Sequence, residues 1–363
     1  LQRRPTLLLV DGDAWNYSGQ LPYWRQALEE LKYAYDEWGV KHIPEDVPSI
    51  ETMSTYDIVL WSAPKSSPGL AHSGQVLQEY LKRGGRLWVS GQDVAFYDAG
   101  NPSYMFQPYL YNQTGAHYLG DNSNSRQLTG LGPFEGLTVT ITGGDGANNQ
   151  NYPDVIGIRR PELASRTWQY AEDAAGGVEA STCVPYRSLF FSFGFEAIAS
   201  AEIRRTVMNR ALTWLNASPP ESGLRLSATE ATLTGAPGER VTHTLYLRHV
   251  GMAGLPDTVA IKISGQQWRT TVTPSVVTVD PCQMITITVN VTIPGNTGIN
   301  EADTVDLRIR SSLLPSGPSA ILRTKTPAPV LLVDDDRWYQ MESYYREALE
   351  ARDIPYDVWS TRH

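Results

Sequence analysis

The chain has 363 residues, which at about 150 residues per domain indicates two or three folding units rather than one core. Hydrophobic residues make up 41% of it, enough for ordinary buried cores, and this excludes a disordered chain. Because 39 acidic side chains outnumber 30 basic ones, for a net charge of −9, we expect no nucleic-acid partner. The chain has no run of about 18 apolar residues, so we also expect no membrane span.

An internal repeat determines how the chain divides. Three blocks recur at nearly constant spacing: 8–15 (LLVDGDAW) as 331–338 (LLVDDDRW), 23–29 as 344–350, and 35–38 as 356–359. Each copy has an apolar strand, a loop rich in Asp and Trp, a helix with adjacent Ala and Leu, and a second strand. The pattern predicts a β-α-β unit at each end of the chain.

The residues after the first copy predict the rest of an α/β domain. In chain order we expect strands at 56–61, 86–91 and 188–195 and helices at 73–82 and 203–215. Residues 92–153 are rich in Gly, Asn, Ser and Tyr, and we expect a long surface excursion with one weak strand at 137–141. The order of strands and helices predicts a doubly wound, mainly parallel sheet.

Beyond this domain the sequence changes to segments in which Thr, Val and Ser alternate. This pattern predicts an all-β sandwich of about seven strands. The predicted division is 1–4 as the end of a preceding linker, 5–217 as the α/β domain, 218–223 as a linker, 224–326 as the sandwich, and 327–363 as a partial repeat of the α/β domain. A lone β-α-β unit of about 36 residues cannot bury both faces of its strands. We therefore expect either the rest of a second α/β module or a neighbouring molecule or sheet edge to shield Val330 to Val333 and the face around Tyr345, Ala348 and Leu349. The neighbouring molecule or an adjacent sheet edge is favoured.

Several motifs resemble known families. On residues 7–13, 84–93 (GGRLWVSGQD) and 190–214, the first domain resembles the class I glutamine amidotransferase-like superfamily, in its trehalose-utilisation-like, non-amidotransferase branch. On residues 237–241, 265–268 and 291–294, the sandwich resembles the immunoglobulin- or fibronectin-like modules appended to secreted bacterial peptidases and glycosidases. These resemblances imply a flavodoxin-like first domain, an Ig-like second domain, and an extracellular or cell-envelope location.

The amidotransferase resemblance also places a strand-to-helix elbow at Ser90 to Asp93. Active members carry a nucleophilic Cys at this elbow and a His and a Glu after the late strand. Here the elbow has no Cys, and Gly194-Phe195-Glu196 keeps the acid without the His. We therefore expect no catalytic residues of the amidotransferase type.

Acidic residues follow the predicted strands at the sheet edge where ligands bind in open α/β folds. Asp11 and Asp13 either bind Mg²⁺ or cap the following turn, and the lack of an Asp-x-Asp-x-Thr pattern favours the cap. With Asp93 and Glu196 they would line a small acidic cleft. The candidate ligand-binding residues are Asp11, Asp13, Trp15, Gln92, Asp93 and Glu196.

Aromatic residues crowd the loops at the same edge: Trp15, Tyr17, Tyr23, Trp24, Tyr97, Tyr104, Tyr109, Tyr111 and Tyr118. They either stack on sugar rings or pin the excursion onto the sheet, and the second interpretation is favoured. The six His residues have no metal-ligand spacing, two Cys residues are too few for a four-ligand zinc site, and no P-loop or dinucleotide turn is present. We expect no cofactor and no metal.

These observations favour a non-catalytic accessory and interaction region of a larger secreted or cell-surface bacterial protein, for example a peptidase. Its partners would be other domains of that protein, or protein or polysaccharide at the cell surface. Two alternatives remain. One is a carbohydrate-binding module with an aromatic-rimmed cleft, and the other is a hydrolase with an acidic, metal-assisted cleft.

Overall fold

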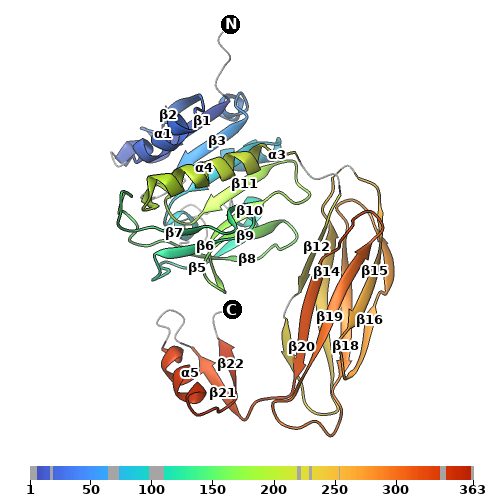
Figure 1. Ribbon diagram of the computed structural model, residues 1–363. Helices are drawn as coiled ribbons and strands as arrows, with labels where there is room; N and C mark the ends of the chain where they lie inside the picture. Colours follow the sequence, from blue (N-terminus) through green and yellow to red (C-terminus); the bar gives the residue numbers. More distant parts are fainter. Residues whose placement is uncertain are drawn as a thin grey trace. The chain divides into compact units, whose positions relative to one another are not determined.

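The computed structural model describes residues 6–16, 19–63, 73–97, 110–218, 222–228, 231–252, 254–335 and 341–360 (Figure 1). The chain forms two compact units, Leu1–Ser218 and Pro219–His363. Residues 1–4 of the predicted preceding linker and residues 219–221 of the predicted domain linker lie outside the described residues. The five-part division of the chain stays a prediction.

One half of the N-terminal unit's sheet consists of parallel strands. Its order is β2-β1-β3-β4-β11, and all four pairings are parallel. The strands are β1 (Leu7–Asp11), β2 (Tyr35–Gly39), β3 (Ile58–Ser62), β4 (Arg86–Ser90) and β11 (Arg187–Phe191). Every residue of β3 is buried, as expected for a strand covered on both faces.

The other half of the sheet is antiparallel. Its strands are β5 (Ala116–Gly120), β6 (Gln127–Gly130), β7 (Thr138–Thr140), β8 (Val155–Ile158), β9 (Ala164–Ala171) and β10 (Ala174–Ala180). Of the ten pairings in the described sheet, six are antiparallel, against the four parallel ones. The prediction of a doubly wound, mainly parallel, flavodoxin-like sheet is therefore wrong: the sheet is mixed, and the described chain as a whole is mostly β, with 22 strands.

The error has a local cause in the excursion predicted at 92–153. That segment contributes β5, β6 and β7 to the sheet rather than lying above it with a single strand. The sequence of β10, AAGGVEA, has little of the β-branched and aromatic character that marks a strand, yet six of its seven residues are buried. Pairing with β9 and β11 makes it a strand, and a one-dimensional pattern does not contain that information.

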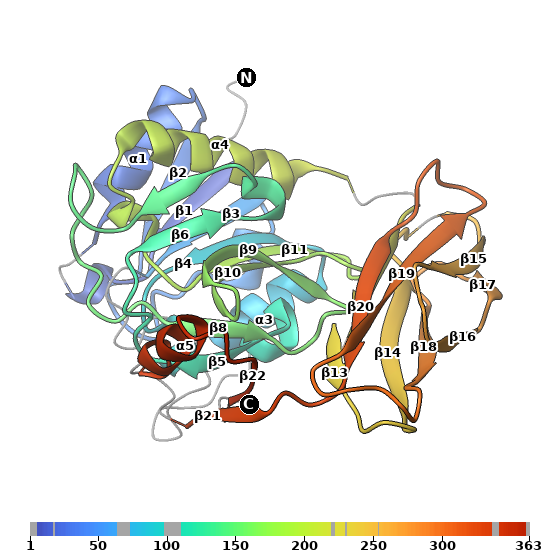
Figure 2. The ribbon, with the colours of Figure 1, turned by 60° about the horizontal axis from the view of Figure 1, so that its bottom comes forward.

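Helices cover the two faces of the sheet (Figure 2). On one face α1 (Leu21–Glu30) and α4 (Ala201–Asn216) pack together over a cluster of buried residues that includes Leu9, Trp24 and Trp88. On the other face α2 (Ile50–Met53) and α3 (Gly74–Lys82) cover a second cluster. Ser200 caps α4, because its hydroxyl accepts a hydrogen bond from the Ile203 N–H at 3.4 Å.

The C-terminal unit contains an Ig-like β-sandwich. One sheet has the order β12-β14-β18-β16 and the other β13-β20-β19-β15-β17. The strands are β12 (Leu224–Ala228), β13 (Thr232–Thr234), β14 (Arg240–His249), β15 (Asp257–Ser264), β16 (Arg269–Thr273), β17 (Val276–Val279), β18 (Met284–Thr292), β19 (Ala302–Ser311) and β20 (Ser319–Lys325). Alternate residues of both sheets, such as Leu245 and Leu307, form one shared core.

After the sandwich the chain forms a second β-α-β unit: β21 (Val330–Asp334), α5 (Glu342–Glu350) and β22 (Tyr356–Ser360). Its geometry repeats that of β1-α1-β2. Val330 pairs with Tyr356 as Leu7 pairs with Tyr35, and the parallel register continues identically over five residues. The equivalent residues Lys32 and Asp353 both adopt positive φ, of 60° and 52°, after the helix.

The same side-chain contact also recurs. The Tyr35 hydroxyl donates to Glu29 Oε1 at 3.1 Å, and the Tyr356 hydroxyl donates to Glu350 Oε1 at 2.7 Å. Asp336 to Trp338, which complete the first repeated block, lie outside the described residues. The two sequence copies are thus two copies of one local structure.

Candidate functional site

The predicted elbow is held in place by structural hydrogen bonds. Ser90 Oγ donates to the Phe193 carbonyl and accepts from the Phe195 N–H, both at 2.8 Å, and is buried. Gly91 is required here, because a Cβ at this position would lie 1.9 Å from the Ala63 carbonyl oxygen. The one hydroxyl among residues 90–93 is therefore hydrogen-bonded on both sides.

Gln92 and Glu196 bind the same loop. Gln92 is 3% exposed; its Oε1 accepts from the N–H groups of Asn151 (2.8 Å) and Tyr152 (3.1 Å), while its Nε2 donates to the Asn149 carbonyl at 2.9 Å. Glu196 is fully buried, and its Oε1 accepts from Asn149 Nδ2 at 2.8 Å. Burial raises the pKa of Glu196 to about 7, Asn149 opposes the rise, and the charge of Asp13 adds to it. The two side chains therefore anchor residues 149–152 over the sheet.

Asp11, Asp13 and Trp15 lie at the end of β1. Asp11 Oδ1 accepts from the Asp13 N–H at 3.2 Å, the contact of a turn-capping carboxylate. Asp13 is fully buried, close enough to Glu196 to raise its pKa. Trp15 is half-buried on the short helix η1 (Ala14–Asn16). Burial raises the pKa of Asp11, which Arg25 partly offsets.

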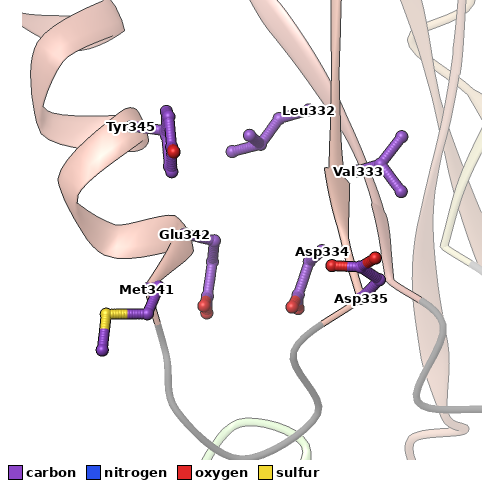
Figure 3. Close-up of a pocket in the computed structure, with 7 residues that line it drawn as sticks. All are labelled: Leu332, Val333, Asp334, Asp335, Met341, Glu342 and Tyr345. Atoms are coloured by element: carbon purple, nitrogen blue, oxygen red, sulfur yellow. The ribbon is translucent and has the colours of Figure 1, made fainter.

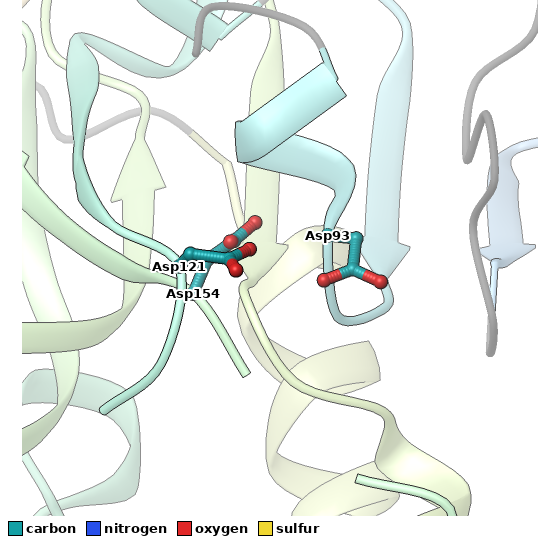
Figure 4. Close-up of side chains that lie close together, drawn as sticks. All are labelled: Asp93, Asp121 and Asp154. Carbon is teal, nitrogen blue, oxygen red and sulfur yellow. The ribbon is translucent and has the colours of Figure 1, made fainter. Parts of the chain in front are cut away.

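Asp93 belongs to a different acidic cluster, together with Asp121 and Asp154 (Figure 4). Asp93 follows β4 at a positive φ of 58°, Asp121 follows β5, and Asp154 precedes β8. Because β5 and β8 are antiparallel, with Gly120 opposite Val155, the last two carboxylates emerge at the same end of the pair. One carboxylate oxygen from each residue lies within 4.8 Å of the others. We call these three residues the acidic triad.

The acidic triad brings together one buried, one half-buried and one exposed carboxyl group: Asp154, Asp93 and Asp121, respectively. Asp154 is 0% exposed; burial raises its pKa well above the ordinary range, and Asp93 and Asp121 raise it further. Burial, and then the charge of Asp121, raise the pKa of Asp93 to about 7. The pKa of Asp121 is also raised by burial. Among the described residues, no Lys, Arg or His forms an ion pair with any of the three.

The structure thus divides the predicted acidic cleft. Asp11, Asp13 and Glu196 stay near the end of β1, while Asp93 joins Asp121 and Asp154. The acidic triad is the single group of three or more potential ligands that come together in the described part of the chain. The sequence analysis missed Asp121 and Asp154, because it did not predict β5 and β8, whose ends position them.

One member of the predicted aromatic rim, Trp24, is part of the core. Trp24 is fully buried and packs its ring 4.9 Å from that of Trp88 and 4.6 Å from that of Phe195, so it is not available to a sugar. Tyr23 lies under the Arg204 guanidinium at 5.0 Å, and the half-buried Tyr118 packs on Phe96. Tyr17, Tyr104 and Tyr109 lie outside the described residues. Trp24, Tyr23 and Tyr118 therefore each contact another side chain of the N-terminal unit.

A second candidate surface lies on the C-terminal β-α-β unit (Figure 3). A cavity of about 590 Å³ opens between the end of β21 and the start of α5. Leu332, Val333, Asp334, Asp335, Met341, Glu342 and Tyr345 line it. In the first copy the residue equivalent to Tyr345 is Trp24, and the rings of Trp88 and Phe195 contact it. The cavity thus lies where the first copy contains aromatic rings from other elements.

Comparisons with known proteins identify no family. No family model matches the chain, and no curated protein matches it. Solved structures give weak likenesses. A PapD-like domain of human CEP192 is 14% identical with a TM-score of 0.23, covering 30% of this chain and 87% of that domain. The periplasmic chaperone SfaE is 11% identical with a TM-score of 0.24, covering 32% of this chain and 67% of that one.

A third neighbour is WR4, an MSP family member of C. elegans, which is 12% identical with a TM-score of 0.20 and covers 28% of this chain and 96% of that one. The resemblance stated from the sequence was to a doubly wound, mainly parallel α/β module, whereas six of the ten pairings in the described first sheet are antiparallel. The amidotransferase-like identification is therefore wrong. The short motifs on which it stood, such as residues 84–93, describe a strand and its exit turn, which a mixed sheet also contains.

Proposed function

We propose that this chain is a non-catalytic interaction region whose C-terminal β-α-β unit binds a partner polypeptide. The observation that carries the proposal is an apolar surface on β21 and β22. Leu331, Val333 and Trp359 are 57%, 48% and 62% exposed. By the register of the two strands, these three side chains share one face. We call it the open face.

The first copy indicates what such a face requires. Leu8 and Val10, equivalent to Leu331 and Val333, are 1% and 0% exposed in a cluster that includes Leu77 and Leu81 of α3. On the edge that faces away from β2, β1 pairs in parallel with β3. This pairing runs from Leu7 beside Ile58 to Asp11 beside Ser62. In the described residues β21 pairs with β22 alone. The occupant that fits is therefore a parallel, apolar strand like β3, followed by a covering helix.

The other side of β21 supports the same kind of occupant. The helix α5 has no buried residue, and Tyr344 and Tyr345 are 69% and 63% exposed. The cavity beside Tyr345 lies at the position where the rings of Trp88 and Phe195 contact Trp24 in the first copy. We expect it to take an aromatic side chain of the partner. Exposed apolar side chains on both sides of β21 are typical of a binding site.

The absence of catalysis is supported by the elbow. Its residues hold loops, as the hydrogen bonds of Ser90, Gln92 and Glu196 indicate. None of the described helices combines the length and the hydropathy that a bilayer span requires. An extracellular or cell-envelope location remains part of the proposal, and a periplasmic chaperone is among the weakly similar structures.

Hydrogen exchange on the whole chain tests the proposal. The probe is a synthetic peptide of residues 55–63 (TYDIVLWSA), which contains the β3 strand. We expect the peptide to slow exchange of the β21 amides, because a parallel partner strand engages the N–H groups on the edge away from β22. A control peptide with Val59→Lys and Trp61→Lys, the positions beside Leu8 and Val10 in the first copy, should not protect them.

Variants of the chain provide the second control. Leu331→Asp with Val333→Asp should abolish protection by the peptide, whereas Leu255→Asp, at a 72% exposed position of the same unit, should leave it unchanged. Equal protection in the double variant, or none in the wild type, contradicts the proposal. A stable dimer that sedimentation velocity shows to be lost in the double variant would identify a second copy as the occupant and would also contradict it.

A further inference from the structure

The acidic triad has a feature that repulsion between carboxylates does not explain. Asp154 is completely buried, and its Oδ2 accepts from the Phe96 N–H at 3.0 Å, while its Oδ1 is buried without any hydrogen-bond partner. A buried carboxylate oxygen without a donor costs free energy that folded proteins normally avoid. Figure 4 shows the carboxylates of Asp121 and Asp154 side by side, facing Asp93.

The backbone around Asp154 is fixed from both sides. Its N–H donates to the Ser192 carbonyl at 3.1 Å, and Ser192 Oγ donates to the Asp154 carbonyl at 2.7 Å. The carboxylate is therefore presented by a rigid element rather than by a mobile loop tip, as a preorganised ligand would be. Relaxation into solvent is not open to this side chain.

We infer that the acidic triad binds a divalent cation of the oxygen-preferring class, calcium or magnesium, with Asp93, Asp121 and Asp154 as its protein ligands. Carboxylate oxygens are the ligands these ions take, at roughly 2.0–2.6 Å. One oxygen from each carboxyl group lies within 4.8 Å of the other two, so all three can contact a single ion at about 2.4 Å. Water would complete the coordination shell, as is usual for both ions.

The charge balance agrees with this inference. Arg126, whose charge affects the pKa of Tyr170 as that of Asp154 does, donates its hydrogen bonds to the Ser125, Gln150 and Asn151 carbonyls and to Asn122. It is therefore committed elsewhere.

Thermal unfolding of the chelator-treated chain tests the inference, with CaCl₂ and MgCl₂ added separately. Because a cation that binds only the folded state stabilises it by mass action, we expect the Tm of the N-terminal unit to rise with concentration. At 100 times the dissociation constant, the unfolding equilibrium constant should fall about 100-fold. The ion that acts at the lower concentration is the better ligand.

Two variants and a control make the test specific. Asp93→Asn and Asp154→Asn should each remove the cation-dependent shift, and Asp154→Asn retains an acceptor for the Phe96 N–H. Asp173→Asn makes the same charge change at an exposed turn position and should keep the full shift. A shift that persists in both triad variants, or no shift with either ion in the wild type, overturns the inference.

If a triad variant fails to fold, Tb³⁺ luminescence of the wild-type protein still tests the inference. Tb³⁺ is an oxygen-preferring ion whose emission is sensitised by nearby phenols, and Tyr118 lies close enough to the triad for all three carboxylates to raise its pKa, after the effect of burial. Wild-type protein should show sensitised Tb³⁺ emission that excess Ca²⁺ abolishes. Emission that Ca²⁺ does not displace would overturn the inference. The peptide experiment on β21 is independent of this result, because it probes the other unit.

Discussion

The β-α-β unit that begins the chain and the one near its end have the same register, the same positive-φ residue after the helix and the same Tyr–Glu hydrogen bond. They differ in burial. Trp24 is fully buried, whereas the equivalent Tyr345 is 63% exposed, and Leu8 at 1% corresponds to Leu331 at 57%. Local interactions are sufficient to specify the unit, and its burial depends on elements elsewhere in the chain.

The difference shows where the stabilising free energy of such a unit originates. Burying a large apolar side chain contributes about 1.5–3 kcal/mol, and in the first copy α3, α4, β3 and the ring of Phe195 provide the covering surface. The second copy keeps the apolar positions without that covering in the described structure. The second copy repeats the local structure of the first but exposes its apolar positions. This exposure is the physical basis for proposing the second copy as a binding element.

The largest expected effect compares the two helices. Trp24→Ala should lower the free energy of unfolding of the N-terminal unit by about 3–5 kcal/mol, because it leaves a cavity between Trp88 and Phe195. Tyr345→Ala should cost less than about 0.5 kcal/mol, as is usual for an exposed position. Urea denaturation followed by circular dichroism measures both. Similar costs at the two positions would mean that α5 is covered in solution and would break the comparison.

The second largest effect is a pH dependence of the free energy of unfolding that arises from Glu196, in a segment that covers the first copy. Glu196 lies in η5 (Phe195–Ala197), which packs on α1, and burial raises its pKa from 4.5 to about 7. A carboxyl group whose pKa is higher in the folded state stabilises most when it is protonated. Its contribution is therefore complete below about pH 4.5 and is lost as the pH rises to about 7, by roughly 3 kcal/mol.

Glu196→Gln should remove this part of the pH dependence. We expect the variant to exceed the wild type in stability above pH 7 and to approach it near pH 4.5, measured by urea denaturation across that range. Glu202→Gln, at an exposed position in the first turn of α4, is the matched control and should follow the wild type. A Glu196→Gln profile parallel to that of the wild type would show that burial does not shift this carboxyl group.

The smallest effect compares equivalent aspartates in the two second strands. Asp357 of β22 forms an ion pair with the buried Lys325 and accepts from the Ala328 N–H at 2.8 Å, whereas Asp36 of β2 accepts from the Tyr56 hydroxyl at 2.7 Å. Asp357→Asn should cost about 1–2 kcal/mol, because Lys325 loses its carboxylate partner. Asp36→Asn keeps an acceptor for Tyr56 and should cost less.

The Asp357 contribution also has a defined pH window. Burial alone would raise the pKa of Asp357, but hydrogen bonds from Lys325 and Ala328 outweigh it and the pKa is lowered. Its stabilisation is therefore present above the ordinary value of 3.8 and is lost as the pH falls below it. Hydrogen exchange of β21 and β22 at pH 7 and pH 3 measures this change. Opening that is equally fast at both pH values would contradict the role of this ion pair.

Sequence patterns were reliable for elements with a strong local signal. The helix expected at 203–215 lies within α4 (Ala201–Asn216), and the strand expected at 86–91 is β4 (Arg86–Ser90). They were unreliable for 92–153 and for β10, whose Gly and Ala residues carry no strand pattern. Those strands form because they pair with neighbouring strands of the sheet, and a local sequence pattern does not show this pairing.

The candidate site shows the same division. The six candidate ligand-binding residues were selected because they follow predicted strands. The structure leaves Asp11, Asp13 and Glu196 near β1, but it places Asp93 in the acidic triad. Asp121 and Asp154 are 33 positions apart in the chain, and nothing in their spacing relates them. The antiparallel pairing of β5 with β8 brings them together.

By itself the sequence determined the strand, helix and strand of the two β-α-β copies, because their repeated pattern lies in residues close in the chain. It also determined the alternating strands of the sandwich. Only the tertiary structure decided that the first sheet is mixed, that three aspartates lie close together, and that one copy is covered while the other is open. Each of these depends on contacts between residues distant in sequence, whose free energy no local pattern records.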